Sequence, residues 1–459
     1  MKIGIKILGC DKNTVESEYI AGLLFRQGHD VMLVEDSIAG CEGVIILTCG
    51  FIREARHETE KTLKAMLQGF GKRSLLGVKS PWILVAGCMP QLYLHHLKQH
   101  FPGAAGFIGI VSPDEVLKAV DSLSQSQGKE QIIRIVDKPA VTLKKYIKRL
   151  QLEKRPYGFL RIADGCDHTC SFCVIPRIKG PYQSVKREIL LREARDMVRQ
   201  GIREINLIAQ DTSKYGIDLY GERYTLVHLL KEIASIRGKF WLRLLYLYPT
   251  GMTAELIELM AGESKICPYV DIPLQHLDEE VLRLMRRPYS WRRTKALISN
   301  VRHAIPDITI RSAFILGYPG ETHSRYDTMK KRLRQLALDR VGFFLYSDEK
   351  NTLAHEMDNK VSRSIARERL KSLARQQADI TLASNMRWIG SEKEILVEAQ
   401  FPDTNLYLGR SQSEAPEVDG FIIFTADQNI KAGDMVNVIV RRADAYEMYG
   451  EMIGTSTKD

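Results

Sequence analysis

The chain of 459 residues lacks an apolar run long enough to cross a bilayer, because its longest hydrophobic stretches have the length of single strands. It begins without a secretory signal pattern, so we expect a cytoplasmic protein whose cysteines stay reduced. Cysteine itself is scarce, with eight in the chain. These shortages argue against a membrane span and against disulfides, and they favour metal or redox use of the cysteines.

Three cysteines, Cys166, Cys170 and Cys173, lie in one loop with the spacing C-x3-C-x2-C, and we call them the loop cysteines. A four-iron cluster takes thiolates at its corners, so three cysteines leave one iron open for a small molecule. A structural zinc site usually has four ligands in two pairs, and here only His168 lies nearby as a fourth. Buried inert thiols are a further alternative, weakened by the polar neighbours in the loop.

Three further cysteines each come directly after an expected strand, and we call them the sheet-end cysteines: Cys10, Cys49 and Cys88. Strands alternating with amphipathic helices predict a parallel α/β domain over residues 1–123. Since the carboxyl ends of parallel strands form a common crevice, these cysteines can converge there. Each alone could be an ordinary core cysteine, but their shared position favours a second cluster. Cys41 and Cys267 lack such placement and are expected to be structural or incidental.

A polar and then basic stretch predicts a linker over residues 124–151. From residue 152 to residue 385, six strand patterns alternate with amphipathic helices. This alternation predicts an incomplete, TIM-like (β/α) barrel with its site at the carboxyl ends of the strands. The six strands are expected at residues 158–162, 204–209, 240–247, 269–273, 308–316 and 342–346.

Short strands separated by Pro, Asn, Asp and Gly predict a small β-barrel over residues 386–455. The whole chain carries a formal charge of +10, which suggests an acidic partner such as nucleic acid. From residue 386 onward, however, seven basic and thirteen acidic residues give −6. A module that grips RNA should be basic, because phosphate contacts dominate nucleic-acid affinity. The acidic module suits a basic protein partner better.

The loop spacing, followed by Val174-Ile175-Pro176, resembles that of the radical S-adenosylmethionine (SAM) enzymes. Together with the sheet-end cysteines and the terminal β-barrel, it resembles the methylthiotransferase family over essentially the whole chain. This resemblance implies an auxiliary [4Fe-4S] cluster on the sheet-end cysteines, a SAM-binding [4Fe-4S] cluster on the loop cysteines and a C-terminal TRAM domain. It also implies radical hydrogen abstraction from an unactivated carbon, sulfur from the auxiliary cluster, a methyl group from a second SAM, and an electron donor such as flavodoxin or ferredoxin.

Four polar residues at strand ends or within the barrel are our candidates for holding SAM: Gln210, Arg243, Gln275 and Arg311. A buried arginine needs an anionic partner, and the SAM carboxylate would serve. Structural salt bridges inside the barrel are the alternative interpretation of the two arginines.

Three segments look like the RimO-type branch of the family: Ala209 to Tyr220, Tyr346 to Glu349 and Ser413 to Gly420. That resemblance implies a protein substrate, small-subunit ribosomal protein S twelve, methylthiolated at the β-carbon of an aspartate. The alternatives are a methylthiotransferase acting on adenosine in tRNA, and a non-catalytic iron–sulfur protein on the ribosome.

The chain departs from the family pattern at three positions near the expected SAM site. Asp11 stands where the family often has proline. Val185 and Leu277 likewise replace the usual residues of their motifs.

Overall fold

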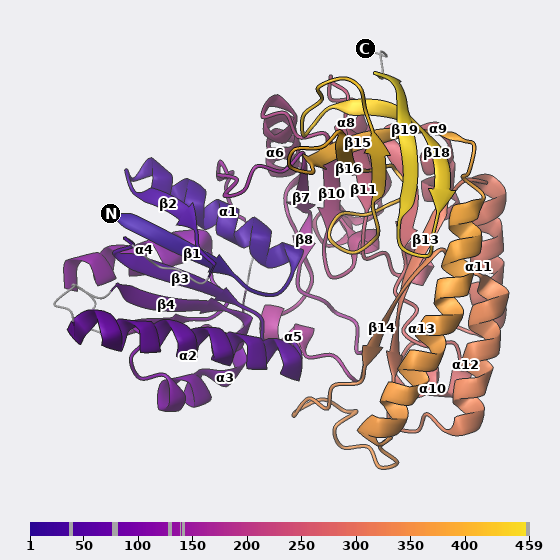
Figure 1. Cartoon of the computed structure of the whole chain (residues 1–459). Coiled ribbons are helices and arrows are strands. Elements are labelled where there is room, and N and C mark those ends of the chain that lie inside the picture. The colour runs from indigo at the N-terminus through magenta and orange to yellow at the C-terminus, as the bar shows by residue number, and fades with distance from the viewer. Residues whose placement is uncertain (36–39, 76–80, 127–130, 138, 140–142, 456–459) are drawn as a thin grey trace.

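The computed structural model describes residues 1–35, 40–75, 81–126, 131–137, 139 and 143–455. Figure 1 shows an N-terminal α/β unit on one side, a half-open barrel in the centre and a small β-barrel lying against it. The expected fold class, with its two parallel α/β units and terminal β-barrel, is therefore confirmed. None of the helices in this part of the chain combines the length and hydropathy that crossing a bilayer requires.

The N-terminal unit is a six-stranded parallel sheet in the order β2-β1-β3-β4-β5-β6. Strands β3 and β4 run through its centre and are almost wholly buried, as expected for continuous apolar runs in a parallel sheet. The strands are β1 (Lys2–Ile7), β2 (Asp30–Leu33), β3 (Gly43–Thr48), β4 (Trp82–Gly87), β5 (Gly106–Ile108) and β6 (Ile132–Arg134). The helices are α1 (Asp11–Arg26), α2 (Arg53–Leu75), α3 (Cys88–His100) and α4 (Pro113–Ser126).

This sheet reaches into the segment expected as a linker. Helix α4 continues to Ser126, and β6 pairs in parallel with β5 at residues 132–134. Strand β6 holds only three residues, of which two are exposed, so its hydrophobic pattern is too short to identify from the sequence. The remaining expected linker residues include positions that lie outside the described ranges.

The central unit is a parallel sheet in the order β14-β13-β12-β11-β10-β7, which is the expected incomplete barrel. Helices cover its outer face (Figure 1). Its strands are β7 (Tyr157–Arg161), β10 (Glu204–Ile208), β11 (Trp241–Leu244), β12 (Ile266–Asp271), β13 (Thr309–Leu316) and β14 (Arg340–Leu345), with a short pair of β8 (Ala163–Asp164) and β9 (Gln183–Ser184) at the mouth. Its helices are α5 (Ile175–Lys179), α6 (Arg187–Arg199), α7 (Ile217–Tyr220), α8 (Leu226–Ala234), α9 (Ala254–Gly262), α10 (Glu279–Leu284), α11 (Trp291–Ala304) and α12 (His323–Leu336).

The long helix α13 (Arg363–Met386) runs along the barrel and leads into the terminal module (Figure 1). That module is a closed barrel in the order β15-β16-β17-β19-β18. Its last strand holds two glycines, Gly450 and Gly454, which interrupt the apolar alternation of the sequence. The strands are β15 (Glu392–Gln400), β16 (Leu406–Arg410), β17 (Ile422–Thr425), β18 (Met435–Ala443) and β19 (Met448–Thr455).

Buried ion pairs fix the N-terminal unit against the central barrel. Arg149 lies between Glu18 and Glu193, with nitrogen–oxygen distances of 3.2 and 3.1 Å. Arg161 of β7 reaches Glu16 of α1 at 2.9 Å. All these side chains are largely buried, so loss of one partner would leave an uncompensated charge. The two units are thus held in one orientation through α1.

A second buried network joins the barrel to the terminal module. Glu204 accepts from Arg243 Nε at 2.6 Å and lies 2.7 Å from Arg410 Nη2, and all three side chains are inaccessible to solvent. Arg410 also pairs with Glu398. Arginines 243 and 410 hold the pKa of Glu204 below its usual range, although burial alone would raise it.

We expect Glu204→Gln to lower the free energy of unfolding by about 3–5 kcal/mol, because two buried guanidinium groups lose their shared anion. Urea denaturation followed by circular dichroism measures this change. The matched control is Glu394→Gln at the edge of the same interface, where the pair with Lys239 is about one-third exposed and should contribute about 0–1 kcal/mol. Equal losses in both variants would contradict the assignment.

Candidate active site between two cysteine groups

The sheet-end cysteines lie together at the carboxyl edge of the first sheet. Gly9 has φ +98°, and a Cβ there would lie 2.6 Å from Cys49 Cβ, so only glycine allows Cys10 to follow so closely. Cys88 interacts electrostatically with both Cys49 and Cys10. Asn13 Nδ2 donates to backbone carbonyls at the ends of β1 and β3 (2.6 and 3.2 Å), which ties these strand ends together.

The loop cysteines lie after β8 in a loop that folds back on itself. The Cys173 amide donates to the Cys170 carbonyl (3.1 Å), and the Cys166 amide donates to the Gly180 carbonyl (3.1 Å). The Ile175 amide donates to Cys173 Sγ (3.4 Å). The three thiols interact electrostatically with one another, so the loop presents them as one group.

In the described part of the chain, the cysteine thiols are shielded from solvent to different degrees and do not form a site for a single metal ion. Burial raises the pKa of Cys49 and Cys166 to about 11 and that of Cys88 and Cys173 to about 12. Within the described ranges, no three His, Cys, Asp or Glu side chains surround a single point as metal-ion ligands would. A cubane is wider than one ion, so its thiolate ligands do not converge on a single point.

The two cysteine groups belong to facing edges of the two sheets. Lys179 of α5 lies 3.2 Å from Asp164 of β8 and interacts electrostatically with Cys88. Tyr246, which follows β11, interacts in the same way with Cys10. Although burial alone would raise the pKa of Asp164, Lys179 and a neighbouring arginine lower it, so the pair is ionic. The sheet-end cysteines therefore lie against the mouth of the barrel.

The barrel mouth also holds polar atoms without partners. Gln210 Nε2 donates to Asp164 Oδ1 (2.9 Å), but its Oε1 is buried and finds no hydrogen-bond partner among the described residues. Arg287 Nε is also buried without a hydrogen-bond partner among the described residues. Gln275 and Tyr246 adopt φ of +68° and +59°, which is strained for these residue types. Unsatisfied buried groups and strained backbone at strand ends are features of a ligand site.

The two arginines expected to hold SAM are engaged elsewhere. Arg243 donates to Glu204 and to the backbone of residues 411 and 412 in the terminal module. Arg311 pairs with Asp271 and Asp419, both at 3.4 Å. The geometry supports structural salt bridges for both arginines, because each pairs with a carboxylate of the protein. Strand alternation in the sequence does not reveal that these side chains face the terminal module. We correct the assignment of Arg243 and Arg311 accordingly.

Several residues of the site were missed. Lys12 is largely buried, with 11% of its side chain exposed, and its Nζ lies 3.2 Å from Asp11 Oδ1 and 3.7 Å from the centre of the Tyr246 ring. Burial alone would lower the pKa of this ammonium, but the neighbouring Asp11 carboxylate outweighs that effect and the pKa is raised. The group is therefore a cation. In the cysteine loop, His168 Nε2 lies 2.7 Å from Asp211 Oδ2. Lys12 lies two residues after Cys10, and this position was the available signal, but its contact with Tyr246 depends on domain packing.

The three departures from the family pattern are accommodated locally. Asp11 is buried beside Lys12, and Val185 and Leu277 are buried in the barrel core. Asp278 caps helix α10, because its side chain accepts from the third helical amide. None of these positions breaks the fold around the cysteine groups.

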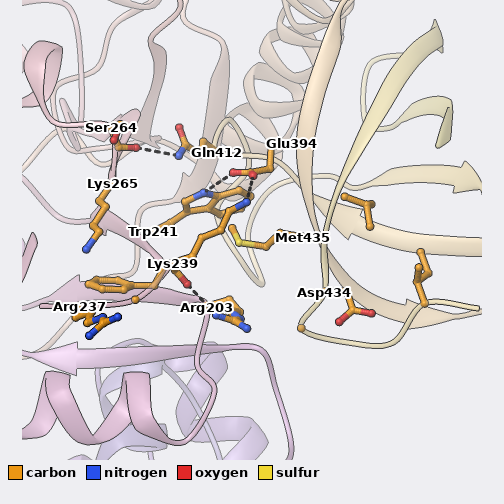
Figure 2. Close-up of a pocket in the computed structure, with 15 residues that line it drawn as sticks. Arg203, Arg237, Lys239, Trp241, Ser264, Lys265, Glu394, Gln412, Asp434 and Met435 are labelled. Carbon is orange, nitrogen blue, oxygen red and sulfur yellow. Dashed lines mark hydrogen bonds and ion pairs between the residues drawn. The ribbon is translucent and has the colours of Figure 1, made fainter. Parts of the chain in front are cut away.

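A cavity of about 1280 Å³ lies at the opposite, amino-terminal ends of the barrel strands, against the terminal module. Figure 2 shows Lys239 and Trp241 both reaching Glu394, at 2.7 and 3.3 Å. Across the same cavity, Gln412 donates to the Ser264 carbonyl (3.4 Å). Since barrel enzymes place chemistry at the other end, we assign this cavity to domain contact.

Comparison with known proteins agrees with this architecture. Family profiles match residues 2–109 (Uncharacterized protein family UPF0004), residues 160–333 (Radical SAM superfamily) and residues 389–453 (TRAM domain). The ribosomal protein uS12 methylthiotransferase RimO of Thermotoga maritima is 35% identical over 99% of this chain and 100% of its own length. RimO of Moorella thermoacetica is 39% identical over 98% and 99%. The chain belongs to the RimO family of methylthiotransferases.

As a member of this family, the protein is a radical SAM enzyme that uses SAM and iron–sulfur chemistry. Its fold also resembles that of the radical SAM methyltransferase TsrM from Kitasatospora setae (TM-score 0.54, 14% identity, 74% of this chain and 72% of TsrM). The cobalamin-dependent SAM radical enzyme OxsB gives a TM-score of 0.54 at 12% identity, over 83% of this chain and 61% of OxsB. At such identities the likeness concerns the fold alone.

Proposed function

We propose that this RimO-family protein adds a methylthio group to the β-carbon of an aspartate in ribosomal protein uS12. The observation that carries the proposal is the full-length identity to RimO proteins, whose names specify uS12, combined with two cysteine groups facing one another. We also propose that it acts in the cytoplasm, where ribosomal proteins are found.

Two [4Fe-4S] clusters fit the donor set, one on the loop cysteines and one on the sheet-end cysteines. When bound, these groups and SAM supply hydrogen-atom abstraction, sulfur and the methyl group. Gln210 and Gln275 would hold SAM from the strand ends, and Gln210 Oε1 offers a buried acceptor still without a partner. The packing of the first sheet against the barrel mouth would keep water away from the reacting carbon.

Lys12 is the residue we assign to the substrate carboxylate. Its ammonium lies at the barrel mouth, next to Cys10 and over Tyr246, and so stands between the sheet-end cysteines and the barrel. Asp11 Oδ1 already occupies one of its three hydrogen-bond positions. A substrate aspartate would supply a second carboxylate to the same cation, which would place its β-carbon beside Cys10.

The net negative charge of the terminal module is weak support for a basic substrate, because part of that charge is paired within the protein. Three acids of the segment 413–420 pair with barrel arginines, namely Glu414 with Arg340, Glu417 with Arg155 and Asp419 with Arg311 (3.4, 2.9 and 3.4 Å). These charges hold the module on the barrel, and the buried Glu414 and Asp419 are not available to a partner. The preference for uS12 over tRNA therefore rests on the relatives and the Lys12 site.

The test is anaerobic incubation of the reconstituted protein with SAM, sulfide, dithionite and a uS12 peptide that contains the aspartate. We expect a methylthio group on the aspartate by mass spectrometry, together with cleaved SAM. Cys170→Ala is the negative control and should give neither product. The non-catalytic alternative predicts bound iron without SAM cleavage in the unaltered protein, and that result would overturn the proposal.

A further inference from the structure

A strongly basic segment borders the loop cysteines. Residues 283–295 hold five arginines and one lysine with no acidic residue. We call this stretch, which joins α10 to α11, the arginine segment. Such an unbroken run of one sign creates a local positive field that attracts acidic partners.

The arginine segment is bonded directly to the cysteine loop. The Ser171 amide donates to the Met285 carbonyl (3.2 Å), and Ser171 Oγ donates to the Leu284 carbonyl (2.7 Å). Ser171 lies between Cys170 and Cys173. The segment therefore has a fixed position relative to the group that must receive electrons.

A cavity of about 660 Å³ opens between this segment and the loop. Its lining includes Thr169, which immediately precedes Cys170, one acidic residue, Glu279, and four arginines of the segment: Arg283, Arg286, Arg287 and Arg293. Arg286 and Arg293 are exposed, and Arg286 adopts φ +55°, which costs energy in an arginine. Arg283 shares its charge with Glu280 through two hydrogen bonds (2.9 and 2.6 Å). The remaining cations outnumber the acids at this rim.

We propose that the arginine segment is the docking surface for an acidic one-electron carrier protein, which delivers electrons beside Cys170. This inference rests on the proposed function, because that chemistry needs a reductant. The sheet-end cysteines interact electrostatically with a different part of the mouth, formed by Asp164, Lys179 and Tyr246, so a carrier on the segment would leave the substrate side open. Transient redox encounters use small, charge-complementary surfaces of this kind.

The test compares three full-length reconstituted proteins: the unaltered chain, Arg286→Glu/Arg293→Glu, and Lys144→Glu/Lys148→Glu. The last makes the same charge change at two exposed lysines between the first sheet and the barrel. The probe is a purified bacterial flavodoxin, an acidic carrier, and binding is measured by interferometry at several salt concentrations. We expect the arginine variant to raise the Kd by at least about tenfold at low salt, with a flatter salt dependence, while the lysine variant changes it little.

A second readout is the ratio of SAM cleavage driven by reduced flavodoxin to SAM cleavage driven by dithionite. This ratio should fall in the arginine variant, and a general structural defect would not change it. Unaltered flavodoxin binding in that variant, or weakening only in the lysine variant, would overturn the proposal, as would loss of tRNA binding without loss of flavodoxin binding. Failure of uS12 modification under dithionite, with flavodoxin binding as expected, would instead contradict the proposed function alone.

Discussion

Replacing Cys10, Cys49 and Cys88 together by alanine is expected to abolish methylthio transfer while reductant-dependent SAM cleavage continues. The loop cysteines are untouched, and iron content after anaerobic reconstitution should fall by about half, because one of two four-iron clusters loses its thiolates. Iron analysis and quantification of 5′-deoxyadenosine measure the two effects. An iron content equal to that of the unaltered protein would show that the sheet-end cysteines hold no cluster.

The chain offers a matched control for this variant. Cys41 and Cys267 are buried in hydrophobic cores away from both groups. Cys41→Ala/Cys267→Ala removes thiols and leaves small cavities, but it should keep both iron content and product formation. Loss of iron in this control would mean that any cysteine replacement perturbs reconstitution, and the comparison would then carry no information on ligation.

Lys12→Met is expected to lower kcat/KM for the uS12 peptide by about tenfold to about a hundredfold, the value of one charged hydrogen bond of about 1.5–3 kcal/mol. Methionine keeps the unbranched shape beside Tyr246 and removes the charge. The sharper readout is substrate preference, since the unaltered enzyme should strongly favour the aspartate peptide over its asparagine counterpart. In Lys12→Met that preference should collapse.

Two companion variants separate substrate binding from local stability. Lys12→Met/Asp11→Asn removes both charges, so no buried carboxylate is left without its cation, and it should show the same collapsed preference. Asp11→Asn alone removes the competing anion and should lower KM for the aspartate peptide. If Lys12→Met retained full preference for aspartate, Lys12 would have no part in recognising the carboxylate.

Periodicity predicted the central strands of the first sheet because these are continuous apolar runs, as in Val44 to Leu47, whereas the short β5 and β6 and the half-exposed β2 gave no such pattern. The same logic placed Cys10, Cys49 and Cys88 at one sheet edge, since parallel strands end on the same side. Periodicity could not predict which residues a side chain within a strand contacts. Arg243 lies in an expected strand, yet only tertiary packing reveals its partner Glu204 and its contact with the terminal module.

Contacts between domains account for the other omissions. Lys12 and Tyr246 are separated by more than two hundred positions in the sequence, and their contact exists only because the first sheet packs on the barrel mouth. Strain at Tyr246 and Gln275 is likewise a property of the folded chain. Such features bear directly on function because they hold reacting groups in place, and local propensity does not encode them.

The most direct test of the account is a competition in one tube. Equal amounts of ribosomal protein uS12 and unmodified tRNA are incubated anaerobically with the reconstituted protein, SAM, sulfide and dithionite, and both substrates are analysed by mass spectrometry. The account predicts a methylthio group on an aspartate of uS12 and unchanged tRNA. A methylthio group on adenosine, with uS12 unchanged, would contradict it.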